Sequence, residues 1–257
     1  MRIEIIPTPD ITAQVLSVLP RSATLTVTCL PRDGVRKTVD VAIELASLGY
    51  DVVPHLAARQ ISGEKQLREL LNQLDDAGTA SLFVIGGDGA STSGSFRSGG
   101  ELLRAIRDIT GLRFTLGVAG YPEGHPAMSI DATVGVLEQK QALADHVVTQ
   151  LCFDTASLIS YLRLLDTVGI TLPVWLGVPG TIRLRRLLAI AAKIGVGPSL
   201  SFARKGQNLR LMSAANFDSA SFRARLTSSA RDAGVPFAGF HLYSFNDFGS
   251  PLPSASR

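Results

Sequence analysis

A short stretch in the middle of the chain concentrates side chains that can do chemistry. Residues 120–126 read GYPEGHP, so Tyr121, Glu123 and His125 bring an aromatic ring, a carboxylate and an imidazole onto one segment that two prolines stiffen. A simple turn requires none of these three groups. One His and one Glu are an incomplete ligand set for a metal ion. The stretch therefore predicts a binding or catalytic loop, and no metal site is predicted.

A second candidate site follows the apolar run at 81–86. The glycines of 86–89 (GGDG) would let a ligand approach the backbone closely, and Asp88 would add a carboxylate. A tight turn that favours Asp explains the same residues equally well, so both interpretations stay open. The GxGxxG spacing of a dinucleotide-binding fingerprint is absent.

Two further polar residues stand inside or at the end of apolar runs. Glu4 lies between Ile3 and Ile5, so in a strand it is expected to point into the interior, where burial favours the neutral acid and suits a general acid. A buried salt bridge is the alternative for Glu4. Gln150 ends the run HVVTQ, where its amide would recognise a flat heterocycle by paired hydrogen bonds. Satisfaction of that amide by neighbouring backbone is the alternative for Gln150.

Eight short β-rich runs alternate with segments whose apolar residues recur at helical spacing. The β-rich runs are 2–6, 23–29, 51–56, 81–86, 114–118, 146–150, 173–178 and 237–243. The helical segments are 11–18, 38–48, 67–74, 100–109, 131–143, 155–167, 183–194 and 219–231. Alternation of this kind predicts a parallel sheet with helices packed on it.

The number of strands and the residues that end them favour a (β/α)8 barrel of the TIM type. Eight parallel strands can close into a barrel, whereas an open doubly wound sheet is the competing architecture. Polar residues gather at the carboxyl ends of the runs, where the catalytic residues of a barrel converge. About fourteen residues follow the last run and end in GSPLPSASR, a composition that resists helix formation, so the last helix is expected to be missing or truncated. We expect one barrel domain over 1–248 and a flexible tail over 249–257.

Composition narrows the classes of partner. Charged residues make up 18% of the chain and the net charge is only +3, without a long basic run, so no nucleic-acid partner is expected. No apolar run is long enough for a membrane helix, the N-terminus lacks a signal-peptide pattern, and the two cysteines show no CxxC spacing. We therefore expect a cytoplasmic protein with no membrane partner. A homo-oligomer whose partner subunit covers the missing helix is a further hypothesis.

These motifs, in this order, resemble the methylenetetrahydrofolate reductase family. The matching units are Glu4 in IEIIPTP, PHL at 54–56, Gly87-Asp88, YPEGHP at 121–126, Thr149-Gln150 with Phe153-Asp154, and FHLY at 240–243 with Asn246. The resemblance spans nearly the whole chain. It implies a (β/α)8 barrel that interconverts 5,10-methylenetetrahydrofolate and 5-methyltetrahydrofolate with NADH or NADPH as the hydride carrier.

The resemblance also implies roles for particular residues. Glu4 would be the acid that opens the methylene bridge to a reactive iminium, and Asp88 would lie close to the pterin and the hydride-transfer centre. Gln150 would bind the pterin, and the other substrate-binding residues would be Thr28, Phe153 and Tyr243. The cofactor-binding residues would be His55, Gly87, Tyr121, Glu123, His125 and Lys140.

Departures from the family pattern concern the flavin. Gly86 stands where an arginine usually precedes the Gly-Asp pair, and the aromatic residue expected around 98–100 to contact a flavin is missing. Asp247 replaces a late arginine that commonly follows Asn246, so recognition of the glutamate tail must differ. The segments 193–204 and 151–154 resemble a divergent branch associated with direct transfer from NADH. A flavin-independent enzyme is therefore predicted.

Three alternatives remain open. The first is a conventional family member that uses FMN or FAD. The second is a catalytically silent barrel that binds tetrahydrofolate and regulates or scaffolds a methyltransferase. The third is another barrel enzyme in which Asp88 and Glu123 act as paired acid and base.

Overall fold

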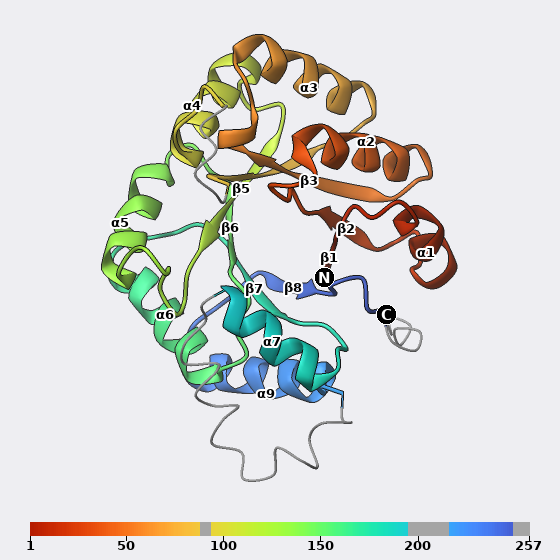
Figure 1. Cartoon of the computed structure of the whole chain (residues 1–257). Coiled ribbons are helices and arrows are strands. Elements are labelled where there is room, and N and C mark those ends of the chain that lie inside the picture. The colour runs from red at the N-terminus through yellow and green to blue at the C-terminus, as the bar shows by residue number, and fades with distance from the viewer. Residues whose placement is uncertain (88–93, 195–215, 249–257) are drawn as a thin grey trace. The chain divides into compact units, whose positions relative to one another are not determined.

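The computed structural model describes residues 1–87, 94–194 and 216–248, and its eight strands form a closed parallel barrel in chain order (Figure 1). The strands are β1 (Arg2–Ile5), β2 (Thr24–Val27), β3 (Asp51–Ala57), β4 (Ser81–Ile85), β5 (Thr115–Gly120), β6 (His146–Thr149), β7 (Val174–Pro179) and β8 (Gly239–Tyr243). Each strand falls within a residue or two of its predicted run. The prediction of a TIM-type barrel is confirmed, and the open sheet is excluded.

The helices also lie where the apolar spacing places them. They are α1 (Ile11–Val18), α2 (Gly34–Ser47), α3 (Glu64–Asp76), α4 (Gly99–Thr110), α5 (Ile130–Lys140), α6 (Thr155–Thr167), α7 (Leu184–Ile194) and α9 (Ser219–Asp232), with a short 3-10 helix η1 (Ala58–Gln60) after β3. Among the described residues none of these helices combines the length and the hydropathy that a membrane span needs.

After β8 the structure describes the chain only as far as residue 248. After β8, the backbone N–H of Asp247 donates to the carbonyl of Ser244 and closes a turn, and no helix begins in the described residues up to Phe248. The predicted tail 249–257 lies outside the described residues, as does most of the extra segment between α7 and α9.

The chain divides into two compact units. Unit 1 comprises Met1–Ala119 and Gln139–His146, and unit 2 comprises Gly120–Glu138 and Val147–Arg257. In unit 1, β1 to β5 pair in sequence, and α2 lies along β3 (Figure 1). The apolar stripe of α3 is fully covered, with all four of its leucines at 1% exposure or less: Leu67, Leu70, Leu71 and Leu74. Such a stripe supplies the apolar burial that stabilises a helix against a sheet.

Unit 2 contains β6 to β8 and the helices around them. β7 pairs with β8 in a register that sets Gly177 opposite His241 and Pro179 opposite Tyr243. Helix α6 packs against α9. Because side chains alternate along a strand, His241 and Tyr243 project on the same side of β8, and their ring centroids are 5.0 Å apart.

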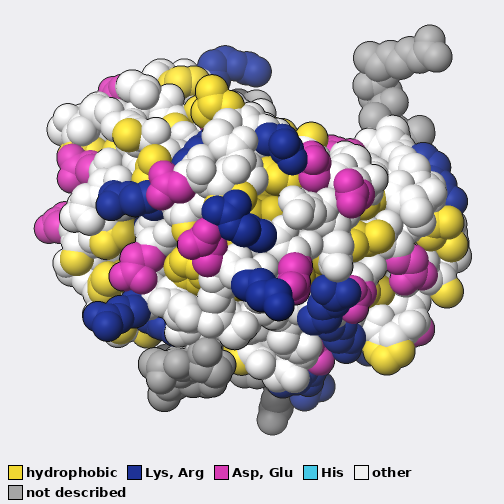
Figure 2. Space-filling view, turned by 90° about the horizontal axis from the view of Figure 1, so that it is seen from above, with side chains coloured by type: hydrophobic (Ala, Val, Ile, Leu, Met, Phe, Trp, Pro, Cys, Tyr) yellow, Lys and Arg dark blue, Asp and Glu magenta, His cyan; other side chains and the backbone are white. Residues whose placement is uncertain are grey.

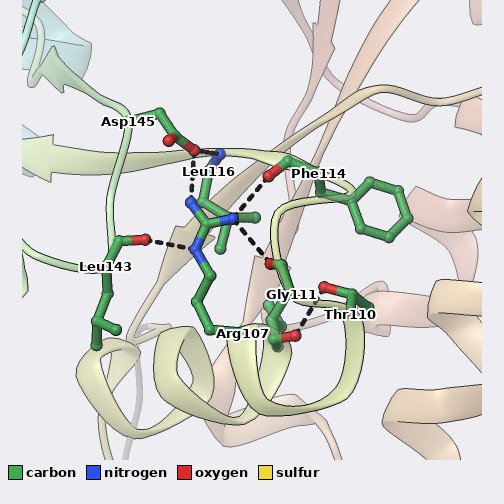
Figure 3. Close-up of polar contacts among 8 residues, drawn as sticks. Arg107, Thr110, Gly111, Phe114, Leu116, Leu143 and Asp145 are labelled. Carbon is green, nitrogen blue, oxygen red and sulfur yellow. Dashed lines mark hydrogen bonds and ion pairs between the residues drawn. The ribbon is translucent and has the colours of Figure 1, made fainter.

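The largely buried side chain of Arg107 links three segments of unit 1 by hydrogen bonds (Figure 3). Arg107, in the last turn of α4, donates from Nε to the carbonyl of Leu143 at 2.8 Å and from Nη1 to the carbonyl of Phe114 at 2.9 Å. Its Nη2 lies 2.6 Å from Oδ2 of Asp145, which also accepts the backbone N–H of Leu116. The side chain of Arg107 is 11% exposed. It therefore ties α4 to the start of β5 and to the turn before β6.

We expect Arg107→Ala to lower the free energy of unfolding by about 2–3 kcal/mol, because it leaves the part-buried carbonyls of Leu143 and Phe114 without this donor. Urea denaturation at neutral pH measures this loss. The matched control is Arg113→Ala, whose ion pair with Asp75 is exposed and whose loss should cost about 0–1 kcal/mol. Equal losses of unfolding free energy in the two variants would contradict the role of Arg107 in linking these segments.

Candidate active site

In unit 1, a carboxylate and an imidazole meet inside the strands. Oε2 of Glu4 on β1 lies 3.8 Å from Nε2 of His55 on β3, and the two side chains are only 12% and 6% exposed. The ring of His55 also packs against Phe83 on β4, with ring centroids 4.7 Å apart. Glu4 is thus largely buried, as its place between two isoleucines predicts, and its neighbour is a predicted cofactor residue. A buried acid beside an imidazole is an arrangement suited to proton transfer.

A second polar pair lies at the amino ends of β1 and β6. Nη1 of Arg2 is 2.6 Å from Nε2 of His146, and because a guanidinium only donates, the imidazole nitrogen accepts. Burial lowers the pKa of the Arg2 guanidinium, and the carboxylate of Asp51 partly offsets this. This pair lies at the end of the strands that stabilises a barrel rather than at the end that does chemistry.

The predicted Gly-Asp site is described only in part. Gly87 has a φ of 85°, a left-handed conformation that favours glycine, and a Cβ there would stand 3.2 Å from the Cβ of Ala57. Nη1 of Arg59 donates to the Gly87 carbonyl at 2.6 Å. Asp88 lies outside the described residues. Sequence reasoning missed Arg59, although an arginine directly after the strand that carries His55 was the available signal.

Thr28 and Lys140 are the other predicted site residues of unit 1. Oγ1 of Thr28 is buried and has no hydrogen-bond partner among the described residues, so it is available to a ligand. Cε of Lys140 lies 3.8 Å from the position that a Cβ on Gly100 would take, in the first turn of α4. Burial lowers the pKa of the Lys140 ammonium group. A cation beside the first turn of a helix can hold a phosphate.

In unit 2, the loop after β5 is held in a fixed shape. The rings of Tyr121 and His125 meet edge to face, with centroids 5.2 Å apart. Nδ1 of His125 accepts the N–H of Ala127 at 3.2 Å, and the backbones of His125 and Met128 form a β-bridge. The predicted rigid loop is thus ordered by its own backbone as well as by its prolines.

The carboxylate of this loop has a cysteine partner. The thiol of Cys152 lies 3.3 Å from Oε1 of Glu123 and 3.4 Å from the carbonyl oxygen of Asp154. Cys152 is completely buried. Asp154 in turn caps α6 by accepting the N–H of Ser157 at 2.8 Å. The structure therefore adds Cys152 to the residues that position Glu123.

Gln150 and Tyr243 approach each other where β6, β7 and β8 end. Oε1 of Gln150 accepts the N–H of Leu151 at 2.8 Å, which is the backbone satisfaction given above as the alternative. The hydroxyl of Tyr243 donates to the carbonyl of Thr149 at 3.1 Å. A Cβ on Gly177 would stand 3.1 Å from the carbonyl oxygen of Gln150 and 2.8 Å from the ring of Tyr243. These groups therefore pack closely around Gly177 of β7.

The third predicted aromatic residue has a packing role in the structure. Phe153 is 3% exposed, and its ring centroid is 6.3 Å from that of Phe217. Phe217 continues the cluster to Phe222 on α9 at 5.5 Å.

The described residues contain no group of three or more His, Cys, Asp or Glu side chains that could hold a metal ion. Figure 2 shows Lys and Arg side chains interspersed with Asp and Glu on the face that it displays. No single-sign field covers that face.

Comparisons with known proteins give one consistent result. A family model described as methylenetetrahydrofolate reductase matches residues 17–193. Methylenetetrahydrofolate reductase 1 of Schizosaccharomyces pombe is 31% identical over 136 residues, which are 50% of this chain and 22% of the yeast protein. A probable methylenetetrahydrofolate reductase (NADPH) of Caenorhabditis elegans is 32% identical over 139 residues, or 51% of this chain and 20% of that protein. The matched region thus spans about a fifth of each relative.

Among solved structures, a Clostridium thermocellum protein described as binding two copies of 5-methyl-5,6,7,8-tetrahydrofolic acid superposes with a TM-score of 0.63. The match covers 94% of this chain and 87% of that protein at 12% sequence identity. At this identity the likeness concerns the fold.

Tyr161 of α6 contacts the backbone of the loop that follows β5. Its hydroxyl oxygen accepts the N–H of Tyr121 at 3.3 Å, and burial raises the pKa of Tyr161 to about 12. A raised folded-state pKa makes stability fall as pH rises above the unfolded value of 10.0 toward the folded one. We expect wild type to lose about 2 kcal/mol more unfolding free energy between pH ~9 and ~12 than Tyr161→Phe. Urea titrations of both proteins at each pH measure the difference, and parallel losses would contradict it.

Proposed function

Because the chain belongs to the methylenetetrahydrofolate reductase family, we propose that it interconverts 5,10-methylenetetrahydrofolate and 5-methyltetrahydrofolate with NADH or NADPH as the hydride donor. The observation that carries the proposal is the buried pair of Glu4 and His55, 3.8 Å apart. The reduction consumes one proton and one hydride, so it needs an acid in a site that excludes water.

Glu4 is the proposed acid. Its carboxyl group gives a proton to N10 as the bond from N10 to the methylene carbon breaks, which leaves an iminium cation at N5. The nicotinamide hydride then adds to that carbon and forms the methyl group, and NAD(P)+ is released. His55 is the neighbouring group that can return a proton to Glu4. Oxidation of the methyl group runs through the same steps in reverse.

The folate contacts are proposed for Gln150, Thr28, Phe153 and Tyr243. The bond from Leu151 engages Oε1 of Gln150, which leaves the Nε2 amino group to donate to acceptor atoms of a pterin. The buried Oγ1 of Thr28 and the ring of Tyr243 offer a donor and a flat apolar surface. The Clostridium thermocellum barrel with bound 5-methyltetrahydrofolic acid supports the use of this fold for a reduced folate. Asp88 remains in the proposal as a residue near the reacting carbon.

The hydride carrier is assigned to His55, Gly87, Tyr121, Glu123, His125 and Lys140. Lys140 beside the first turn of α4 fits the diphosphate that nicotinamide and flavin dinucleotides share. A flavin, where one is bound, would accept the hydride from NAD(P)H and pass it on. Gly86 and the segment 98–100 lack the side chains that flavin-binding relatives use, so direct transfer from NADH is the version we propose.

The remaining expectations complete the proposal. We place the activity in the cytoplasm, on one domain over 1–248, without a nucleic-acid or membrane partner. A homo-oligomer would cover the outer side of β8, where no helix follows in the described residues up to 248.

From the proposed function we predict that the purified protein is colourless and that it oxidises NADH when methylenetetrahydrofolate is added. The absorbance spectrum of the protein as purified and the loss of NADH absorbance measure both properties. Flavin bands with activity would instead support the conventional FMN- or FAD-dependent member. Folate binding without turnover, with or without added flavin, would favour the silent barrel.

We also predict that Glu4→Gln lowers kcat by roughly 10²–10⁴-fold while the Kd for folate changes little, because only the proton donor is lost. Steady-state kinetics and equilibrium binding measure the two quantities. The matched control is Glu69→Gln, an exposed carboxylate of α3, which should keep the wild-type rate. A near wild-type rate in Glu4→Gln would remove Glu4 from the acid role.

A further inference from the structure

A cavity of about 400 Å³ lies in unit 2 at the amino ends of β7 and β8. It is bordered by the end of α6, the turn from α6 to β7 and the turn from α9 to β8. Tyr243, a proposed folate contact, lies at the opposite end of β8. Pockets for small organic ligands have volumes of about 300–1,000 Å³. The cavity is therefore large enough for such a ligand, and it lies away from the part of the candidate active site in this unit.

The inner wall of the cavity is apolar. Five side chains that are 9% exposed or less form it: Leu162, Leu165, Ile170, Val174 and Val235. The half-buried ring of Phe237 also lines the cavity, and its centroid is 5.1 Å from that of Phe240. An apolar group that enters the cavity would be removed from water against these side chains.

The two helices that border the cavity end in the same way. Gly169 follows α6 and Gly234 follows α9, with φ values of 78° and 67°. The N–H groups of Ile170 and Val235 donate back to carbonyls in the last turns of these helices, at 2.9 and 3.0 Å. Such a helix end holds the residue after the glycine against the helix, and both of these residues belong to the inner wall. The wall is therefore preformed, which lowers the entropic cost of binding a ligand.

One acidic side chain stands at the rim of the cavity. Among the described residues that line it, Asp166 is the only one that carries a charge, and this residue is exposed. Asp166 lies in the last turn of α6, where a carboxylate opposes the helix macrodipole, so helix stability does not explain it. The carboxylate and the carbonyl end of α6 both favour a cation at this rim.

We propose that this cavity binds a small organic cation with an aromatic or branched apolar body. The ammonium group of the ligand lies on Asp166, and the apolar body packs on the inner wall and on the ring of Phe237. Apolar burial supplies the affinity, and the carboxylate selects a cation over a neutral or anionic molecule of the same shape. The site does not depend on the proposed function.

The test uses 2-phenylethylamine, which is a cation at neutral pH, and compares it with the neutral 2-phenylethanol and the anionic phenylacetate. Isothermal titration calorimetry of the full chain measures the three affinities. We expect the amine to bind with a Kd of about 1 mM or below and about tenfold more tightly than the alcohol, with phenylacetate the weakest. Asp166→Asn should lose the preference for the amine and keep the affinity for the alcohol. Ala238→Phe, which enlarges an exposed lining residue, should weaken both.

The matched control is Asp232→Asn, which removes an exposed carboxylate from the end of α9 outside the cavity lining and should keep the preference. Circular dichroism checks that each variant is folded. Equal affinity of wild type for the amine and the alcohol would overturn the cation site, as would a preference that survives in Asp166→Asn. Unchanged binding in folded Ala238→Phe would overturn the place of the site, and failure of wild type to bind the amine would overturn the proposal as a whole.

Discussion

The strands of both units depend on glycines that leave space for a neighbouring ring. In unit 1, a Cβ on Gly117 would collide with the imidazole of His146, so only glycine lets that ring lie against β5 and receive its bond from Arg2. In unit 2, a Cβ on Gly177 would collide with the ring of Tyr243 and with the backbone of β6. Protein interiors are close-packed, so these rings have no other space to move into. The pair of Arg2 and His146 in unit 1 and the proposed folate surface of unit 2 therefore both depend on a glycine in the strand beside them.

The fold could be predicted almost completely from the sequence, because each element carries its own periodic signal. The run 155–167 was bounded correctly, since Asp154 offers a capping carboxylate at one end and the apolar spacing stops at the other. Helix α2 begins at Gly34, four residues before the predicted start at Thr38. Its first turn contains Arg36 and Lys37, which face away from the core and so carry no apolar signal. Errors of this kind affect boundaries and not the order of elements, which is what determines a barrel.

The candidate site could be predicted only residue by residue. Glu4 could be identified because a carboxylate between two isoleucines on a barrel strand is expected to point into the barrel. Its approach to His55 depends on the register of three strands, which no local pattern contains. The thiol of Cys152 against Glu123 and the guanidinium of Arg186 against Phe245 join residues 29 and 59 positions apart. Such contacts follow from tertiary packing, so the sequence supplied the candidates but not the pairs.

The starts of α4 and α7 differ in how well they follow the residue preferences that stabilise the first turn of a helix. Helix α4 begins as isolated helices prefer, with the hydroxyl of Ser98 accepting the N–H of Glu101 and the Glu101 carboxylate accepting the N–H of Arg97. Helix α7 begins with arginines instead, and the turn that Arg186 contacts contains two left-handed residues in succession. Two unfavourable features are therefore in contact at this place. Conflicts of this kind concentrate at functional sites, where the surrounding structure holds the strained conformation in place.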